Sequence, residues 1–334
     1  MILITGGAGY IGSHVNKALH KKGYDTIVLD NLSHGHEYAV KWGEFIEGDL
    51  SDSDLLKSIF NSYDIQGVMH FAAFTSVSES IEFPVMYFKN NYKNTLNLFK
   101  NMEIANINKF IFSSTAALYG NPESIPITEK NKLNPINPYG KSKLMVEKIL
   151  EQKSKEKSND FNYISLRYFN ASGADPDLEI GEDHNPETHL IPLTLDAAIG
   201  KREKIAIFGN DYNTPDGTCI RDYIHVCDLA QAHINAFEYL QENFENSDDI
   251  KENSVFNLGN GNGFSVKEVI DTCEKITKKE INKEIANRRE GDPDILIADS
   301  KKAINVLNWK PKFNSLDKIV ETAWKWHKKL NRNI

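Results

Sequence analysis

The chain has 334 residues, of which 26% are charged and 40% are hydrophobic, a composition typical of a globular protein of about two domains. Its net charge of −8 argues against nucleic acid or an anionic membrane surface as the main partner. There is no basic amino-terminal region and no long apolar run, so we expect no signal peptide, no membrane span and a cytoplasmic location. The three cysteines lack metal-ligand spacing and suit a reducing compartment, and we expect no metal site.

Short, nearly continuous apolar runs alternate with amphipathic stretches in the first half of the chain. Such runs are typical of strands that are buried on both faces of a sheet, and the stretches between them indicate helices that cover those faces. The runs lie at residues 1–5, 26–29, 67–73, 109–114 and 163–169, and the amphipathic stretches at 13–22, 52–62 and 91–105. This alternation predicts an α/β fold with a doubly wound parallel sheet.

A glycine-rich segment follows the first predicted strand and opens a helix at about residue 13. Gly6, Gly9 and Gly12 fit the pattern GxxGxxG, and with Gly7 the segment also fits GxGxxG. Glycines here allow a tight turn and let backbone N–H groups approach a pyrophosphate at the helix N-terminus. Glycines also mark ordinary turns, but this position after the first strand of an α/β pattern favours a dinucleotide site.

Asp30 ends the second predicted strand, 18 residues beyond Gly12. A carboxylate at this place can accept hydrogen bonds from both hydroxyls of an adenosine ribose, and it would repel a 2′-phosphate. We therefore expect NAD rather than NADP, with a turn-forming Asp30–Asn31 pair as the alternative. Asp49 follows the next strand, where its carboxylate could accept a hydrogen bond from the adenine amine.

The composition and the pattern of predicted elements change after about residue 170. Loops rich in Gly, Pro, Asp and Asn appear at 171–186 and 209–218, and the alternation of strands and helices becomes less regular. We expect residues 1–170 to form an NAD-binding Rossmann domain. The segment near 223–240 again has the pattern of a strand followed by a helix, and we expect this return segment to rejoin that domain. Residues 171–334 would then form a second, smaller α/β domain that binds the substrate.

Tyr139 and Lys143 lie four residues apart in a segment rich in helix formers, so they share one helix face. A phenol with a pKa of about 10 is a poor base, but a nearby ammonium and a positively charged nicotinamide favour the phenolate and lower that pKa. General-base catalysis needs such tuning. Thr115 leaves the predicted strand at 109–114, the fifth when the strand before Asp49 is counted, at its carboxyl end, where ligands bind in such sheets. The alternatives are a chance YxxxK spacing and a simple hydroxyl-rich loop.

The chain resembles the bacterial-type UDP-glucose 4-epimerases of the extended short-chain dehydrogenase/reductase family. The segments that carry this resemblance are GGAGYIGSH (6–14), LDN (29–31), HFAA (70–73), FSSTAALYG (112–120), YGKSKLMVE (139–147), RYFNASGA (167–174), IFGNDYNTPDGTCIRDYIHVCDLA (207–230) and RREGDP (288–293). The resemblance implies an isomerase with tightly bound NAD. It implies that a UDP-hexose is oxidised to a 4-keto sugar, turned over and reduced from its other face.

The resemblance also implies residue roles. Tyr139 would take the proton of the sugar 4-hydroxyl, Lys143 would hold the nicotinamide ribose, and Thr115 would hydrogen-bond the 4-oxygen. The implied cofactor contacts are Gly6, Gly9, Tyr10, Ile11, Gly12, Asp30, Asn31, Asp49, Leu50, Phe71, Ala72, Ala73, Asn90, Ser113, Tyr139, Lys143 and Phe169. The implied UDP-sugar contacts are Thr115, Tyr139, Asn170, His189, Leu190, Ala206, Phe208, Arg221, Arg289 and Asp292. Arg221 and Arg289 would supply local positive charge for the diphosphate.

The resemblance implies a homodimer through helices near 84–100 and 139–152, although the periodicity of these helices could equally mean an intramolecular face. Three positions depart from the family pattern. Thr75 replaces a lysine that would contact the cofactor, and His189 stands where an asparagine often contacts substrate. Leu296 occupies the position beside the sugar 2-substituent, where a tyrosine would exclude N-acetyl sugars. The sequence thus leaves UDP-N-acetylhexosamines and UDP-uronic acids open as alternative substrates.

Two other readings of the sequence are weaker. A nucleotide-sugar 4,6-dehydratase or decarboxylase would need an acid or base after the fifth strand, where this chain has Ala116 and Ala117. A non-catalytic dinucleotide sensor would have no use for Tyr139, Lys143 and Thr115 at catalytic spacing.

Overall fold

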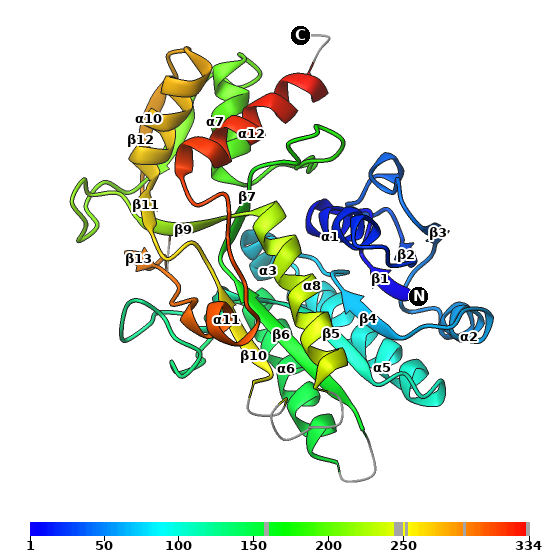
Figure 1. Cartoon of the computed structure of the whole chain (residues 1–334). Coiled ribbons are helices and arrows are strands. Elements are labelled where there is room, and N and C mark those ends of the chain that lie inside the picture. The colour runs from blue at the N-terminus through cyan, green and yellow to red at the C-terminus, as the bar shows by residue number, and fades with distance from the viewer. Residues whose placement is uncertain (157–159, 244–249, 251–252, 290–291, 332–334) are drawn as a thin grey trace.

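A seven-stranded parallel sheet forms the larger part of the computed structural model, which describes residues 1–156, 160–243, 250, 253–289 and 292–331 (Figure 1). In sheet order its strands are β10 (Val255–Leu258), β6 (Asn162–Tyr168), β5 (Lys109–Thr115), β4 (Gly67–His70), β1 (Ile2–Thr5), β2 (Thr26–Asp30) and β3 (Glu44–Glu47). Every neighbouring pair is parallel. The carboxyl ends of all these strands therefore meet at one edge, where a ligand site is expected.

Helices cover both faces of this sheet. The first face carries α1 (Tyr10–Lys21) and α8 (Val226–Glu242), and the second carries α2 (Ser53–Ser62), α5 (Asn94–Ile104) and α6 (Pro138–Lys155). Shorter helical segments are α3 (Val77–Glu82), α4 (Pro84–Tyr87), a π-helix (Phe88–Lys93) and 3₁₀ turns at Glu37–Ala39 and Ala116–Leu118. The sheet lies between the two helical layers, as in a doubly wound fold (Figure 1).

The apolar runs of the strands are continuous because neighbouring side chains enter different cores. On β1, Ile2 and Ile4 pack into the core shared with α1 and α8, whereas Leu3 packs into the core shared with α2, α5 and α6. All three side chains are at most 1% exposed. Burial of both faces explains why these runs do not alternate with polar residues.

A smaller assembly lies at the top of Figure 1. Its strands are β7 (Asn170–Ser172), β9 (Ile220–His225), β11 (Gly263–Ser265) and β13 (Ile295–Leu296), with a separate pair β8 (Ile205–Phe208) and β12 (Lys283–Ala286). Its helices are α7 (Leu190–Ala198), α10 (Val266–Thr277) and α12 (Leu316–Leu330), while α11 (Lys301–Val306) contacts β10. A third apolar core joins α7, α10 and α12 to β8 and β9.

The predicted fold class is confirmed, and the five apolar runs form β1, β2, β4, β5 and β6. Helix α1 begins at Tyr10, three residues earlier than predicted, because Gly9 is its N-cap. The predicted return segment divides: β9 joins the smaller sheet, whereas α8 packs on α1 and the larger sheet. β10 also returns to the larger sheet beside β6. The division at residue 170 stays a prediction, because the chain crosses between the two parts more than once.

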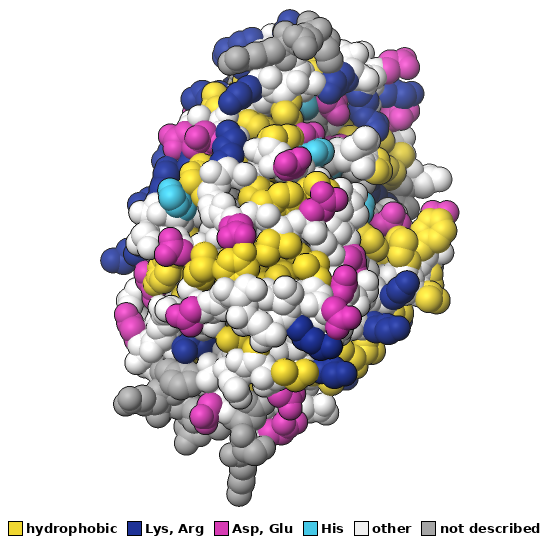
Figure 2. Space-filling view, turned by 90° about the vertical axis from the view of Figure 1, so that its right-hand side faces the viewer, with side chains coloured by type: hydrophobic (Ala, Val, Ile, Leu, Met, Phe, Trp, Pro, Cys, Tyr) yellow, Lys and Arg dark blue, Asp and Glu magenta, His cyan; other side chains and the backbone are white. Residues whose placement is uncertain are grey.

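The surface carries mixed charge. Figure 2 shows acidic and basic side chains interspersed on the face that lies to the right in Figure 1. Among the described helices, none has the length and apolar content needed to cross a lipid bilayer.

Candidate active site

The glycine loop between β1 and α1 has the form that a dinucleotide site requires. Gly6 has a φ of +75°, and a side chain on it would overlap the backbone that follows β4. A side chain on Gly12 would overlap the carbonyl of Gly6, so loop and helix can approach this closely only with glycine. α1 begins without a side-chain cap and without an acidic residue in its first turn. The positive end of the helix dipole is therefore suited to a pyrophosphate.

Asp30 lies at the end of β2, beside this loop. Its carboxylate accepts hydrogen bonds from the backbone N–H groups of Ala8 at 3.0 Å and Leu32 at 2.9 Å, which fix its orientation. A carboxylate has about four acceptor positions, so it can also receive ribose hydroxyls. The Asn31 amide donates to the Asp49 carboxylate at 2.6 Å, which joins the ends of β2 and β3. The structure thus brings together the residues predicted for the adenosine side.

The remaining predicted cofactor residues follow the same edge of the sheet. They are Tyr10 and Ile11 in the first turn of α1, Leu50 after β3, Phe71, Ala72 and Ala73 after β4, Asn90 in the π-helix, Ser113 in β5 and Phe169 after β6. The Leu50 side chain is buried in the core beneath α2, so a cofactor contact there would involve its backbone. The Ser113 hydroxyl hydrogen-bonds Tyr168, a partner that the sequence did not indicate.

Tyr139 and Thr115 meet where β5 ends and α6 begins. Tyr139 is in the first turn of α6, and its hydroxyl hydrogen-bonds the Thr115 side chain. Pro138 occupies the first helical position, and the Asn137 side chain caps the helix by accepting from the Gly140 N–H at 2.8 Å. Proline at this position and a polar cap are strong signals for a helix start. The helix start therefore fixes the position of the phenol over the carboxyl end of β5.

Lys143 lies one turn further along α6 and is 2% exposed. Its ammonium donates to the Ser113 carbonyl at 2.8 Å and lies 4.9 Å from the centre of the Phe112 ring. Burial lowers the pKa of Lys143 to about 7. Burial raises the pKa of Tyr139, although the hydrogen bond from Thr115 acts in the opposite direction. In the protein without bound NAD, burial thus raises the phenol pKa, and the predicted lowering, which includes the positive charge of the nicotinamide, stays a prediction.

A buried polar network holds α6 against β5 and β6, and the sequence analysis missed it. The Glu147 carboxylate accepts from Ser114 Oγ at 2.6 Å and pairs with the Arg167 guanidinium at 2.5 Å. Arg167 also donates to the Tyr119 hydroxyl at 3.0 Å, and that hydroxyl donates to Asn257 at 2.7 Å. We call these five residues the Glu147 network. Its signal was the i, i+4 spacing of Glu147 from Lys143, which places both on one helix face.

A second missed residue is Asn91, in the π-helix. Its side chain accepts from the Phe74 N–H at 2.8 Å, donates to the Phe74 carbonyl at 2.9 Å and donates to Ser142 Oγ at 3.2 Å. Asn91 thereby ties the segment after β4 to α6. Single π-helical turns are common at functional sites, but sequence alone does not reveal them.

Four of the predicted UDP-sugar residues in the second half of the chain form two pairs. Arg221 on β9 forms an ion pair with Asp292, and the Arg289 guanidinium lies 4.1 Å from the centre of the Phe208 ring. A cleft of about 650 Å³ is lined by Arg289 and Asp292 together with residues of the 121–125 loop. The guanidinium of Arg289 therefore lies at a cavity large enough for part of a nucleotide. The charge of Arg221 is already partly balanced by Asp292.

Leu296 connects this region to the catalytic residues. It is paired with Arg221 between β13 and β9, and its side chain packs with Ala116, Tyr119 and Phe169 beside Thr115. The other predicted substrate residues lie on separate elements of the smaller assembly. Asn170 begins β7, Leu190 begins α7 and Ala206 is in β8.

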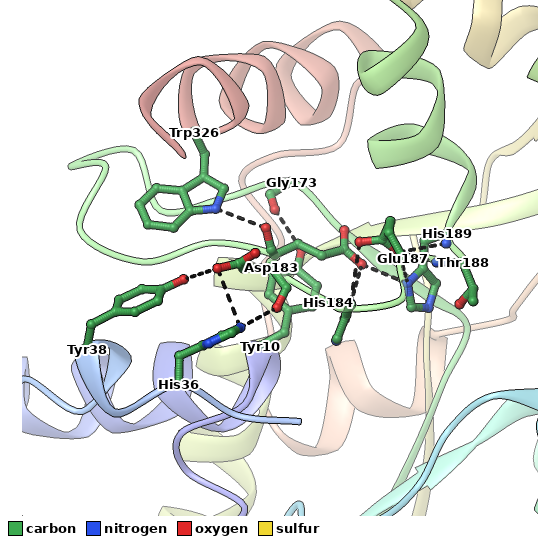
Figure 3. Close-up of polar contacts among 11 residues, drawn as sticks. Tyr10, His36, Tyr38, Gly173, Asp183, His184, Glu187, Thr188, His189 and Trp326 are labelled. Carbon is green, nitrogen blue, oxygen red and sulfur yellow. Dashed lines mark hydrogen bonds and ion pairs between the residues drawn. The ribbon is translucent and has the colours of Figure 1, made fainter. Parts of the chain in front are cut away.

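His189, the last predicted substrate residue, belongs to a cluster of Glu182, His184, Glu187 and His189, which we call the loop tetrad (Figure 3). His189 Nδ1 lies 2.8 Å from the Glu182 carboxylate and 3.1 Å from that of Glu187. Burial opposes the imidazolium form, but these carboxylates outweigh it and raise the pKa of His189 to about 10. The spacing ExHxxExH is visible in the sequence, although the cysteines, which lack CxxC spacing and paired histidine ligands, gave the expectation of no metal site.

The parallel sheet, glycine loop and Tyr–Lys pair together define a nucleotide-dependent enzyme of the short-chain dehydrogenase/reductase type. A family model described as GDP-mannose 4,6 dehydratase matches residues 3–322. The chain is 51% identical to a UDP-glucose 4-epimerase of Halalkalibacterium halodurans over 98% of this chain and 95% of that protein.

Solved structures agree with the sequence relatives. The UDP-glucose 4-epimerase of Brucella ovis in complex with NAD superposes with a TM-score of 0.91 at 44% identity, covering 97% of each chain. The UDP-Glc/GlcNAc 4-epimerase of Campylobacter jejuni gives a TM-score of 0.83 at 44% identity, covering 98% of this chain and 99% of that one. The chain belongs to the UDP-glucose 4-epimerase family, which confirms the resemblance in its sequence.

Proposed function

We propose that this protein interconverts UDP-glucose and UDP-galactose by epimerisation at C4, with NAD held at the glycine loop. The observation that carries this proposal is the hydrogen bond between Tyr139 and Thr115 at the carboxyl end of β5, with Lys143 on the same helix one turn away. This arrangement presents a base and a hydroxyl partner to one oxygen of a ligand in the crevice. The three related epimerases named above support the same reaction.

In this reaction the chain positions and moves one proton. The Tyr139 phenolate accepts the proton of the 4-hydroxyl and returns it after the 4-keto sugar has turned over. Thr115 hydrogen-bonds the 4-oxygen and holds it near the phenol. When bound, NAD supplies the oxidation of C4 and its reversal, and it adds positive charge beside the phenol. Lys143 holds the ribose and adds further positive charge, which opposes the effect of burial on the Tyr139 pKa.

The cofactor and substrate contacts follow the positions described above. Asp30 and Asn31 take the adenosine side of NAD, and the N-terminus of α1 takes its pyrophosphate. Arg221 and Arg289 face the diphosphate of the UDP-sugar. His189 and Leu190 contribute from the start of α7.

Water elimination is a poorer alternative, although the matching family model carries the name of a dehydratase. Ala116 is buried after β5, and Ala117 donates its backbone N–H to Thr115. Methyl groups at these two positions cannot transfer the protons that elimination requires.

UDP-N-acetylhexosamines are a second candidate substrate class. Leu296 packs with Ala116 and Phe169 beside Thr115, and leucine leaves more room there than tyrosine. A relative at 44% identity is named a UDP-Glc/GlcNAc 4-epimerase, which supports this wider specificity.

The proposed assembly is a homodimer in the cytoplasm. Apolar side chains gather on the surface of α3 and α4, where Ile81 is 64%, Phe83 48% and Val85 78% exposed. Exposed apolar groups of this kind are typical of subunit contacts. The cytoplasmic location is supported by the three cysteines, all of which are free thiols.

The test is to incubate the purified protein with UDP-galactose and with UDP-N-acetylgalactosamine separately and to read the product stereochemistry by NMR. We expect the C4 epimer without net consumption of NAD. Tyr139→Phe should retain bound NAD and lose about 10²–10⁴-fold in turnover, because only the proton transfer is removed. Near-normal turnover in this variant, or a dehydrated product in the wild type, would refute the proposal.

A further inference from the structure

The loop tetrad gathers four metal-ligating side chains within eight consecutive residues before α7. Glu182, His184, Glu187 and His189 each offer one ligand atom, and all four atoms lie within 4.8 Å of one another. Figure 3 shows the side chains of His184, Glu187 and His189 close to one another in this loop. A loop this short must be held by its surroundings to keep such an arrangement.

The backbone of this loop is held by other elements of the protein. The Trp326 indole on α12 donates to the Glu182 carbonyl at 3.0 Å. The His36 imidazole hydrogen-bonds the Asp183 carbonyl at 2.8 Å, and the Tyr38 hydroxyl donates to the Asp183 carboxylate at 2.7 Å (Figure 3). Because Asp183 is engaged by the segment after β2, its neighbours Glu182 and His184 remain with the tetrad. The ligand set is therefore preorganised by contacts outside itself.

The imidazole–carboxylate separations lie near the edge length of a tetrahedral metal site. Glu182 lies 2.8 Å from His189 Nδ1 and 3.3 Å from His184 Nδ1. Glu187 Oε1 lies 3.1 Å from His189 Nδ1, and Glu187 Oε2 lies 3.6 Å from His184 Nδ1. Four ligands at bond lengths of about 2.0–2.1 Å are separated by about 3.3–3.4 Å in a tetrahedron. The observed separations fall on both sides of that value, so little movement is needed to close around a cation.

The charge and chemistry of the set also fit a zinc-type cation. Two carboxylates balance a divalent ion, and imidazole with carboxylate is a common ligand combination for zinc. Glu182 is well buried, with a side chain that is 7% exposed, and its Oε1 atom has no hydrogen-bond partner other than the imidazoles it faces among the described residues. A buried carboxylate oxygen at the centre of such a cluster is suited to bind a metal.

We propose that Glu182, His184, Glu187 and His189 form a structural site for one Zn²⁺-type divalent cation. The ion would close the 182–189 loop and fix His189, which is the N-cap of α7. It has four protein ligands and therefore no position for a reacting water. The site shares His189 with the proposed UDP-sugar contacts, but its evidence is the geometry of the loop alone, and its test reads zinc binding rather than epimerisation.

The competing description is a metal-free set of ion pairs between two imidazolium groups and two carboxylates. The two carboxylates balance either one divalent cation or two imidazolium groups, so the net charge of the cluster is the same in both cases. They differ in one observable respect, because only the metal site binds one cation per chain and loses it when a single ligand is removed.

The experiment is a zinc titration of the intact, tag-free protein with a chromophoric chelator as competitor, combined with elemental analysis after desalting. We expect one zinc per chain, a rise in the thermal unfolding midpoint with zinc, and a visible absorption band of four-coordinate Co²⁺ when cobalt replaces zinc. His184→Gln should lower zinc affinity by more than about 10-fold, since even second-shell changes cost about 10–100-fold. Glu187→Gln should weaken binding in the same way.

His20→Gln is the matched control, because it removes an exposed imidazole on α1 that is not a member of the tetrad. It should retain one zinc per chain. The proposal is overturned if the wild type retains well under one equivalent of zinc. It is also overturned if His184→Gln binds zinc as tightly as the wild type, which would identify adventitious surface binding.

Discussion

The Glu147 network and the loop tetrad each gather acidic and basic side chains, but they draw them from very different lengths of chain. The network joins residues of β5, α6, β6 and β10, and the Glu147 and Arg167 side chains are 7% and 6% exposed. The tetrad comes from eight consecutive residues, and its His189 side chain is 47% exposed. The sheet sets the position of the Glu147 network, whereas local turns and a few anchoring contacts set the position of the loop tetrad.

The first prediction addresses the buried side of this comparison. Glu147→Gln should lower the free energy of unfolding by about 3–5 kcal/mol, because it leaves the buried Arg167 guanidinium without its counter-charge. Urea unfolding measures this change. Glu151→Gln is the control on the same helix, since Glu151 pairs with Lys155 at an exposed i, i+4 position. That variant should change stability by less than about 0.5 kcal/mol. Equal losses in both variants would mean that the network does not anchor α6.

The second prediction concerns a buried histidine of the larger sheet. His70 hydrogen-bonds Thr5 at 2.7 Å and Thr95 at 2.9 Å, and burial lowers its pKa to about 3. The unfolded chain takes up a proton on this imidazole below about pH 6.5, whereas the folded protein stays neutral until about pH 3. Stability should therefore fall as the pH falls through this range, by up to about 1.4 kcal/mol per pH unit from His70.

The measurement is the free energy of unfolding between pH 6.5 and pH 4. His70→Gln should make its pH dependence shallower, whatever its stability at neutral pH. His20→Gln changes an exposed imidazole on α1 and is the control for the loss of one histidine. An unchanged slope in His70→Gln would contradict the assignment of a neutral, buried imidazole.

The same contrast explains how much could be predicted from sequence. The continuous apolar runs fixed β1, β2, β4, β5 and β6, because burial on both faces leaves a direct signature in residue type. The glycine spacing and the Tyr139–Lys143 spacing could also be recognised in the sequence, because each follows from backbone geometry. β10 was missed because its four residues, which follow a polar stretch, are too few to show a repeat of apolar positions. Its partner β6 also lies far away in the sequence.

Side-chain contacts between distant elements were beyond the sequence. The pairing of Glu147 with Arg167 depends on the register of β5 and β6, and the hydrogen bonds of Asn91 depend on a π-helix. The rise in the Tyr139 pKa on burial was not foreseen from the sequence, whose prediction concerned the phenol beside a bound nicotinamide. The UDP-sugar residues came from family resemblance alone, and their roles stay predictions.

The third prediction turns to the substrate side, where substitutions should change specificity and leave the fold intact. Leu296→Tyr should reduce the kcat/KM for UDP-N-acetylgalactosamine by about 10–200-fold relative to UDP-galactose, because the ring would occupy space beside Ala116 and Thr115. Parallel assays with the two substrates give the ratio. Leu296→Met conserves volume and should keep it. A similar loss for both substrates would mean that this position does not contact the 2-substituent.

The smallest effect is expected at the outer edge of the cleft. Arg289 stacks on Phe208, whereas its neighbour Arg288 is engaged by Asp211 at 2.6 Å. If Arg289 supplies charge for the diphosphate, Arg289→Ala should raise KM for UDP-galactose by up to about 5-fold, the range of an exposed ion pair worth about 0.2–1 kcal/mol.

A substitution of the neighbouring Arg288 is the matched control for Arg289→Ala. Arg288→Ala removes an equal charge from the same cleft, but that charge is already balanced by a carboxylate, so its KM should change less. Both exposed substitutions should leave the unfolding free energy within about 0.5 kcal/mol of the wild type. A larger KM effect from Arg288 would reverse the assignment of the two guanidiniums. A marked fall in the unfolding free energy of either variant would mean that these arginines hold the fold together, as the buried Glu147 network does.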